Sequence, residues 1–153
     1  EKGEEVTNFN IGDKVYSRVS GDEPGTFAEF IAIDRNLASH MPNNLSFNEA
    51  SSLPLVALTT IQSFEKAELK ANDKILIHAG SGGIGTFAIQ YAKSKGAFVY
   101  TTTSTNNVEW VRELGADVVI DYKKDVKNLN ASHLLLVRLG LPGGFRKPPS
   151  LRW

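Results

Sequence analysis

The residues with the clearest potential for chemistry form a glycine-rich run, Ala-Gly-Ser-Gly-Gly-Ile-Gly, at positions 79–85. Glycines in the spacing G-x-G-x-x-G leave main-chain N–H groups uncovered, and such groups at the start of a helix bind phosphate. We expect Gly80 to allow a tight exit from a strand, Gly82 to let a pyrophosphate approach, and Gly85 to let the helix pack closely on the sheet. The spacing predicts a dinucleotide site, and a purely structural glycine turn is the alternative.

The segments on either side of this run are those that such a turn needs. Residues 74–78 are mostly aliphatic, which is typical of a parallel strand buried on both faces. After the turn, apolar residues recur at helical spacing, and Gly96 is placed to end that helix. Gly85 is followed by Thr86 and Phe87 rather than by the lysine of a Walker loop, which argues against an ATPase.

The same alternation continues along the chain. We predict a second strand, a second helix and a third strand at residues 97–102, 105–114 and 117–121. A β-α-β-α-β order predicts an α/β fold with a parallel sheet and right-handed connections. A cofactor would then lie across the carboxyl ends of the strands.

The end of the second predicted strand bears on the choice of cofactor. An NAD site usually has a carboxylate there that binds both ribose hydroxyls, but residues 101–107 read Thr-Thr-Thr-Ser-Thr-Asn-Asn. Hydroxyl and amide groups such as those of Thr103, Ser104 and Asn107 can donate to a 2′-phosphate. The sequence therefore favours NADP over NAD, although this loop has no Arg or Lys, and ordinary loop and capping chemistry is the alternative.

Over roughly residues 5–127 the chain resembles the zinc-independent quinone oxidoreductase branch of the medium-chain dehydrogenase/reductase superfamily. The resemblance rests on GDKVY, GTFAEFIAI, LPLVALTT, IHAGSGGIG and LGADVVIDY at positions 12–16, 25–33, 53–60, 77–85 and 114–122. It implies a GroES-like catalytic domain followed by a Rossmann domain that binds NADPH. It also implies hydride transfer to quinones or to the double bond of enones and enals, with a homo-oligomer possible for a full-length relative.

The resemblance also implies roles for individual residues. Thr59 falls near the nicotinamide and Tyr122 near the adenosine, although Thr59 equally suits helix packing and Tyr122 equally suits a surface aromatic at a strand end. Ser104 and Asn107 fall where the 2′-phosphate is held, but several relatives have lysine at the position of Asn107. The cofactor-binding turn comprises Gly80, Ser81, Gly82, Gly83, Ile84 and Gly85. No residue type or motif identifies a proton donor, so the catalytic residues are unassigned.

Three segments follow from these patterns. Residues 1–45 are predicted to be part of the GroES-like domain, with a turn that leads into a strand at 11–16 and a second strand at 26–33. Residues 46–128 are predicted to be part of the Rossmann domain. A capping box, Ser-x-x-Glu, opens a helix at position 46, and Pro54 is expected to interrupt or kink it. Residues 129–153 depart from the pattern and are interpreted as a tail that is disordered or foreign to the fold.

Composition excludes several classes of function. Lys plus Arg and Asp plus Glu balance at 17 each, which argues against nucleic-acid binding. The chain has no cysteine, and its histidines, His40, His78 and His133, are far apart, so we predict no disulfide and no metal site. His78 is interpreted as a structural histidine. The aliphatic run at 134–137 is too short to span a membrane, and a cytoplasmic protein is expected.

One apparent catalytic pair, Tyr91-x-x-x-Lys95, lies in the helix after the glycine turn and is interpreted as a core tyrosine with a helix-end lysine. The predicted function is an NADPH-dependent, zinc-independent oxidoreductase acting on a small quinone or an α,β-unsaturated carbonyl compound. Two alternatives remain open. They are a nucleotide-binding module without turnover and a truncated, catalytically inactive fragment.

Overall fold

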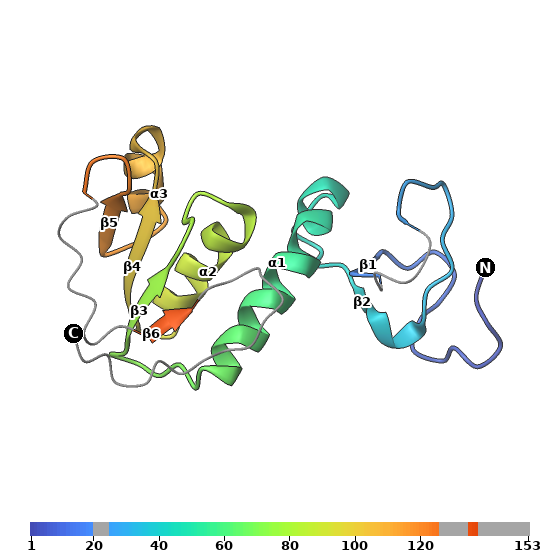
Figure 1. The fold of residues 1–153 in the computed structure, drawn as a ribbon. Coiled ribbons are helices and arrows are strands. Elements are labelled where there is room, and N and C mark those ends of the chain that lie inside the picture. The colour runs from blue at the N-terminus through green and yellow to red at the C-terminus, as the bar shows by residue number, and fades with distance from the viewer. Residues whose placement is uncertain (20–24, 126–134, 138–153) are drawn as a thin grey trace. The chain divides into compact units, whose positions relative to one another are not determined.

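The computed structural model describes residues 1–19, 25–125 and 135–137, the last as backbone (Figure 1). The chain divides into two compact units, Glu1–Leu55 and Val56–Trp153. Helix α1 (Phe47–Lys66) contributes residues to both units. Each unit is described by itself below.

The N-terminal unit contains a two-stranded antiparallel sheet. Strand β1 (Val15–Ser17) pairs with β2 (Ala38–His40), and the 3-10 helix η1 (Arg35–Leu37) precedes β2. The register places Val15 opposite His40. The predicted turn and strand near residues 11–16 are confirmed at Val15 and Tyr16.

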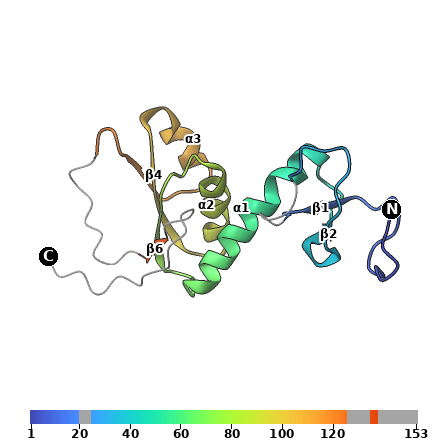
Figure 2. The ribbon, with the colours of Figure 1, turned by 45° about the vertical axis from the view of Figure 1, so that its right-hand side comes forward.

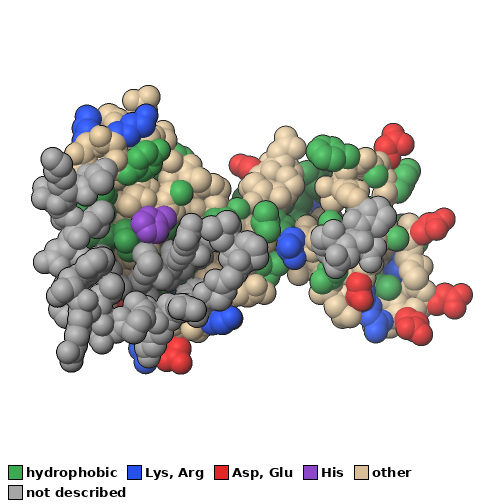
Figure 3. Space-filling model, in the orientation of Figure 1, with side chains coloured by type: hydrophobic (Ala, Val, Ile, Leu, Met, Phe, Trp, Pro, Cys, Tyr) green, Lys and Arg blue, Asp and Glu red, His purple; other side chains and the backbone are tan. Residues whose placement is uncertain are grey.

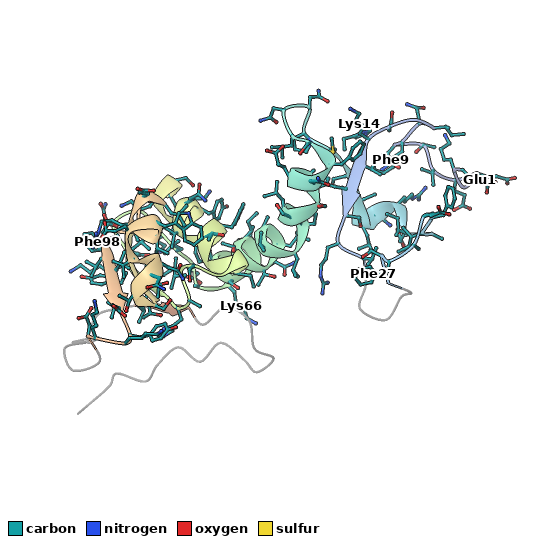
Figure 4. The ribbon with its side chains drawn as sticks, turned by 90° about the horizontal axis from the view of Figure 1, so that it is seen from above. Glu1, Phe9, Lys14, Phe27, Lys66 and Phe98 are labelled. Carbon is teal, nitrogen blue, oxygen red and sulfur yellow. The ribbon has the colours of Figure 1, made fainter. Side chains whose placement is uncertain are left out.

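The second strand predicted for this unit, at residues 26–33, is wrong, because these residues adopt no regular secondary structure. Phe27 and Phe30 are fully or almost fully exposed, with 108% and 91% of their reference surface accessible. Figure 3 shows hydrophobic side chains on this unit among acidic ones, and Figure 4 shows Phe27 at its periphery. An apolar run becomes a strand when a neighbouring strand accepts its hydrogen bonds, and in the described part of this unit none pairs with it.

Helix α1 begins with the predicted capping box. The Ser46 N–H and hydroxyl both donate to Glu49 Oε2, at 2.8 and 2.7 Å, and the Glu49 N–H lies 3.3 Å from Ser46 Oγ. These bonds satisfy donors that a helix start leaves without partners. Pro54 lies inside α1 but does not interrupt it, because the helix continues to Lys66.

The second unit contains a parallel sheet with helices, an α/β fold of the Rossmann type. Strand β3 (Lys74–Ile77), helix α2 (Gly83–Ser94) and strand β4 (Phe98–Thr103) follow the predicted order. The 3-10 helix η2 (Thr105–Asn107), helix α3 (Val108–Glu113) and strand β5 (Val118–Asp121) complete it. Figures 1 and 2 both show α2 along one side of the sheet.

The core of this unit lies between β3, β4 and the helices. Its buried cluster combines apolar residues of the strands, the helices and the loops that join them: Phe64, Ile75, Ile77, Ala88, Ile89, Ala92, Ala97, Val99, Val111 and Ala116. Gly96 and Gly115 follow α2 and α3 with φ values of +78° and +104°, as expected of residues that end helices.

A fourth parallel strand, β6 (Leu135–Val137), pairs with β3 and gives the sheet order β5-β4-β3-β6. It falls inside the segment 129–153, whose other residues, 129–134 and 138–153, lie outside the described part of the chain. Strand order runs from β3 through β4 to β5 on one side, and β6 joins β3 on the other side. The order therefore reverses at β3, and ligands of open α/β sheets bind beyond the strand carboxyl ends at such a point.

Candidate cofactor-binding site

The glycine-rich turn leaves the carboxyl end of β3 at this point of reversal. The turn is made at Ala79, which has a φ of +56°. Its N–H donates to Thr102 Oγ1 at 3.2 Å, and the Gly80 N–H donates to the Thr102 carbonyl at 2.9 Å. The left-handed residue of this turn is therefore Ala79, which precedes Gly80.

Glycine is required at positions 80 and 85 because there is no room for a Cβ atom at either position. A Cβ on Gly80 would lie 2.3 Å from Thr101 Oγ1 on β4 and 3.1 Å from Val111 Cγ1 on α3. A Cβ on Gly85 would lie 2.2 Å from the Ala79 carbonyl oxygen and 2.8 Å from Gly80 Cα. Gly85 thus lets the start of α2 pack closely against the turn that follows β3.

Gly82 and Gly83 present an open main-chain surface. Both are exposed, and a Cβ on Gly82 would meet the Ala79 carbonyl oxygen at 3.3 Å, a tight but tolerable contact. Gly82 is the N-cap of α2 and provides no side-chain acceptor for the first helical N–H groups. These groups have no partner within a helix, so this end of α2 suits an anion.

Polar side chains from the turn, the end of β4 and η2 meet beside it. The Thr103 hydroxyl donates to Ser81 Oγ at 3.0 Å, and Asn107 Nδ2 lies 3.2 Å from the same oxygen. Asn107 Nδ2 also lies 3.3 Å from Ser104 Oγ. The structure thus brings together Ser81, Ser104 and Asn107, which the resemblance assigned to the cofactor, and Thr103, which the sequence analysis named as a possible donor to a 2′-phosphate.

Asp121 is a buried carboxylate at the position of β5 opposite Thr103. A hydrogen bond from the Thr105 side chain is the main cause that lowers the pKa of Asp121, and burial opposes it. Asp121 Oδ1 also accepts from the Lys123 N–H at 3.0 Å. This carboxylate therefore remains charged and is held by its own loop. The sequence predicted that Asp121 lies in a strand, but it did not predict the contact between Asp121 and Thr105.

Thr59 and Tyr122, the other two residues predicted to bind the cofactor, lie on elements that contact the glycine turn or the end of β4. Val56 of α1 lies against Gly83, with its Cγ1 3.6 Å from the position of a Cβ there, and Thr59 follows one helical turn later on the same face. The Tyr122 N–H donates to the Thr103 carbonyl at 3.1 Å, while its side chain is about half exposed, at 51%. The cofactor roles of both residues stay predictions.

Other residues considered from the sequence support the fold. His78 Nδ1 lies 3.2 Å from Thr102 Oγ1, on the strand that holds the turn. The ring of Tyr91 stacks with those of Phe64 and Phe87, and Lys95 Nζ lies 5.1 Å from the Tyr91 ring centroid. These contacts make Tyr91 and Lys95 a packed pair.

The part of the chain that the structure describes lacks two other kinds of site. No three side chains of His, Cys, Asp or Glu in this part of the chain gather as metal ligands would. Within the same residues, no helix combines the length and apolarity that crossing a membrane requires.

Comparison with known proteins matches this region to nicotinamide-dependent enzymes. A family model described as zinc-binding dehydrogenase matches residues 83–133. The NAD(P)H oxidoreductase RTN4IP1, mitochondrial, of Danio rerio is 39% identical over 150 residues, which cover 92% of this chain and 39% of that protein. The NADPH-dependent alkenal/one oxidoreductase, chloroplastic, of Arabidopsis thaliana is 37% identical over 131 residues, covering 80% of this chain and 34% of that protein.

A solved structure agrees with these relatives. The quinone oxidoreductase from Coxiella burnetii superposes with a TM-score of 0.77 at 42% identity, over 81% of this chain and 39% of that one. The chain therefore spans between 34% and 39% of the length of these three proteins.

Proposed function

Because the chain belongs to the quinone oxidoreductase family of the medium-chain dehydrogenase/reductase superfamily, we propose that it forms part of an NADPH-dependent, zinc-independent reductase. The substrate is a small quinone or the double bond of an enone or enal. The names of the three relatives support oxidoreductase chemistry with a nicotinamide cofactor. The observation that carries the proposal is the exposed glycine turn beside a neutral cluster of hydroxyl and amide groups.

The residues of this turn fit the phosphates of a dinucleotide. Gly82 and Gly83 leave room for a pyrophosphate, and the first N–H groups of α2 can donate to it. The hydroxyls of Ser81 and Ser104 can donate to a ribose phosphate. Bound NADPH would supply the hydride, and the share of this chain is to hold and orient the cofactor.

Zinc independence is proposed from the ligands that the chain offers. The matched family model is described as zinc-binding, but this chain contains no cysteine and so no thiolate ligand. We expect NADPH-dependent turnover to be unchanged by a zinc chelator. Loss of turnover that added zinc restores would contradict this part of the proposal.

The remaining parts of the proposal concern the setting of the enzyme. We propose that residues 1–45 belong to a GroES-like catalytic domain and residues 46–128 to the Rossmann domain, and that the full-length protein forms homo-oligomers. Neither nucleic acid nor a membrane is proposed as a partner. A cytoplasmic location is proposed from the sequence, although two relatives are named as mitochondrial and chloroplastic. Fractionation of the source cells tests that location.

Replacing Gly82 tests the turn directly. The Gly82→Val side chain would cover the exposed N–H groups, while the backbone there, at φ −83° and ψ 166°, accepts a β-branched residue. We expect the Kd for NADPH to rise by at least tenfold, about 1.4 kcal/mol. Gly25→Val is the matched control, because a Cβ there meets nothing within 4 Å. Unchanged NADPH binding by Gly82→Val would refute the cofactor site.

A nucleotide-binding module without turnover is the second candidate. It is favoured because the described residues form a cluster suited to a cofactor at the glycine turn, whereas no residue has been assigned as a proton donor. Cofactor fluorescence titration combined with NADPH oxidation by a small quinone and by an enone distinguishes the two. Binding with turnover supports the reductase, binding without turnover supports the module, and no binding of NADPH or NADH refutes both.

A further inference from the structure

Asn107 uses its side-chain amide within the protein rather than offering it to a ligand. Its Nδ2 lies 3.2 Å from Ser81 Oγ and 3.3 Å from Ser104 Oγ. An amide nitrogen carries two hydrogens, so one is available for each serine oxygen. Both donors of Asn107 are thus engaged before any cofactor arrives.

The two serine hydroxyls differ in how many hydrogen bonds they accept. Ser81 Oγ also accepts from the Thr103 hydroxyl at 3.0 Å, so both of its lone pairs are used. Its own hydrogen is then free to donate. Ser104 Oγ accepts from Asn107 and likewise keeps its hydrogen. The two hydroxyls therefore present donors to a third group, and Ser81 has no lone pair left to accept from one.

A serine hydroxyl that can donate a hydrogen bond but has no lone pair left to accept one favours a phosphate group over a ribose hydroxyl as its partner. Phosphate oxygens accept hydrogen bonds and are charged, so each bond to them is strengthened, whereas a ribose hydroxyl also needs an acceptor for its own hydrogen. The Asp121 carboxylate already accepts from the Thr105 side chain and from the Lys123 N–H.

We infer that Asn107 is a positioning residue that selects for a phosphorylated ribose by holding Ser81 and Ser104 as acceptors, so that their hydroxyl hydrogens are directed to the 2′-phosphate. This inference rests on the proposed function, because it requires a dinucleotide at the glycine turn. It assigns Asn107 a role through the serines, whereas the family resemblance implied that this position holds the phosphate directly.

The test is a double-mutant cycle measured with two cofactors. The Kd values of NADPH and NADH are measured for the wild type, Asn107→Ala, Ser81→Ala and the double variant. Each single change is expected to raise the Kd of NADPH about tenfold, the loss of a hydrogen bond to a charged group, and to change that of NADH less than about twofold. The double variant is expected to bind NADPH more tightly than the product of the two single effects would predict, because Asn107 acts in part through Ser81.

Other results would overturn the inference. If the effects of the two changes on NADPH multiply, Asn107 contacts the phosphate independently; if NADPH and NADH weaken equally, its role is merely structural. Asn107→Asp keeps the shape of the side chain and turns the serine hydrogens inward, so it guards against misfolding of the Ala variant. We expect it to weaken NADPH more than Asn107→Ala does and to spare NADH, and unchanged NADPH binding would contradict us.

A failure of the proposed function would look different. In that case the wild type would bind neither NADPH nor NADH. Binding by the wild type with an additive cycle would leave the proposed function standing and remove only the role of Asn107.

Discussion

Ala79 and Thr60 are single residues that oppose the stability of the fold around them. Ala79 has a left-handed backbone, which costs an ordinary L-residue about 1–2 kcal/mol. Thr60 buries its whole side chain, and among the described residues its hydroxyl has no hydrogen-bond partner. A buried hydroxyl without a partner loses the hydrogen bonds that it made with water. Both residues are therefore places where a substitution should raise stability.

Ala79→Gly is expected to raise the free energy of unfolding by about 0.5–1 kcal/mol. Glycine relieves the left-handed strain, and part of that gain is lost to the greater freedom of glycine in the unfolded chain. Chemical denaturation measures the change. Ala88→Gly, inside α2 and buried in the core, is a control that should lower stability by more than about 1 kcal/mol, because it loses both helix propensity and a buried methyl group. Equal losses for the two variants would show that Ala79 is not strained.

Thr60→Val is expected to raise the free energy of unfolding by about 1 kcal/mol, because the methyl group replaces a hydroxyl that bonds to no described residue. Thr101→Val is the matched control. The Thr101 hydroxyl is buried but donates to the Ile77 carbonyl at 2.7 Å, so its loss should cost about 1 kcal/mol. Destabilisation by Thr60→Val would reveal a partner for that hydroxyl.

Among the elements, Asp117 joins the end of α2 to the start of β4. Its carboxylate accepts from Lys93 Nζ at 2.8 and 2.9 Å and from the Val99 N–H at 2.7 Å. Burial alone would raise the pKa of Asp117, but the hydrogen bonds from Lys93 and Val99 together outweigh it and lower the pKa. The charged form is thus favoured in the folded state.

Asp117→Asn should therefore destabilise the protein more at neutral pH than in acid. A carboxyl whose pKa is lowered by folding stabilises the fold above its unfolded pKa, about 3.9, and this stabilisation is lost as the pH falls through the lower folded value. We expect a loss of about 1–2 kcal/mol at pH 7 that shrinks below about pH 4. Urea denaturation of both proteins across this range measures it. A loss independent of pH would mean that the charge of Asp117 is unimportant.

The elements that sequence predicted well are those with local signals. A few neighbouring residues are enough to predict such an element. Examples are the aliphatic run at residues 74–77, the capping box at Ser46 and the glycines at 96 and 115. Strand β6 was missed because its short run acquires a structure only by pairing with β3. The strand expected at residues 26–33 was wrong for the same reason, because an apolar run does not show which strand would pair with it.

The candidate site was predictable in its position and not in its internal contacts. Glycine spacing located the turn, and the residue types of Ser104 and Asn107 indicated donors. The approach of Thr101 to Gly80 and the meeting of Ser81 with Asn107 depend on the register between β3 and β4. Register is a property of the folded sheet, so neither contact could be read from the chain.

For the molecule as a whole, the exposed phenylalanine rings of the N-terminal unit are expected to promote aggregation. Phe27 and Phe30 expose apolar surface that normally marks an interaction or aggregation site. We expect the double variant Phe27→Ser, Phe30→Ser to aggregate less and to bind less of a hydrophobic dye, with no loss of stability in the second unit. Light scattering and dye fluorescence measure these changes.

A matched control for that variant is Phe64→Ser. Phe64 is 4% exposed and belongs to the buried cluster of the second unit. Its loss should cost about 3–5 kcal/mol, as for other large core truncations. If the double variant at Phe27 and Phe30 were similarly destabilised, those rings would be packed rather than exposed.

The pairing of β3 with β6 bears on how the chain is made. Leu135–Val137 complete one hydrogen-bonding edge of an inner strand, so during translation that edge stays open until these residues leave the ribosome. An open apolar edge recruits other strands. A nascent chain arrested before Leu135 should therefore depend on chaperones more than one arrested after Val137.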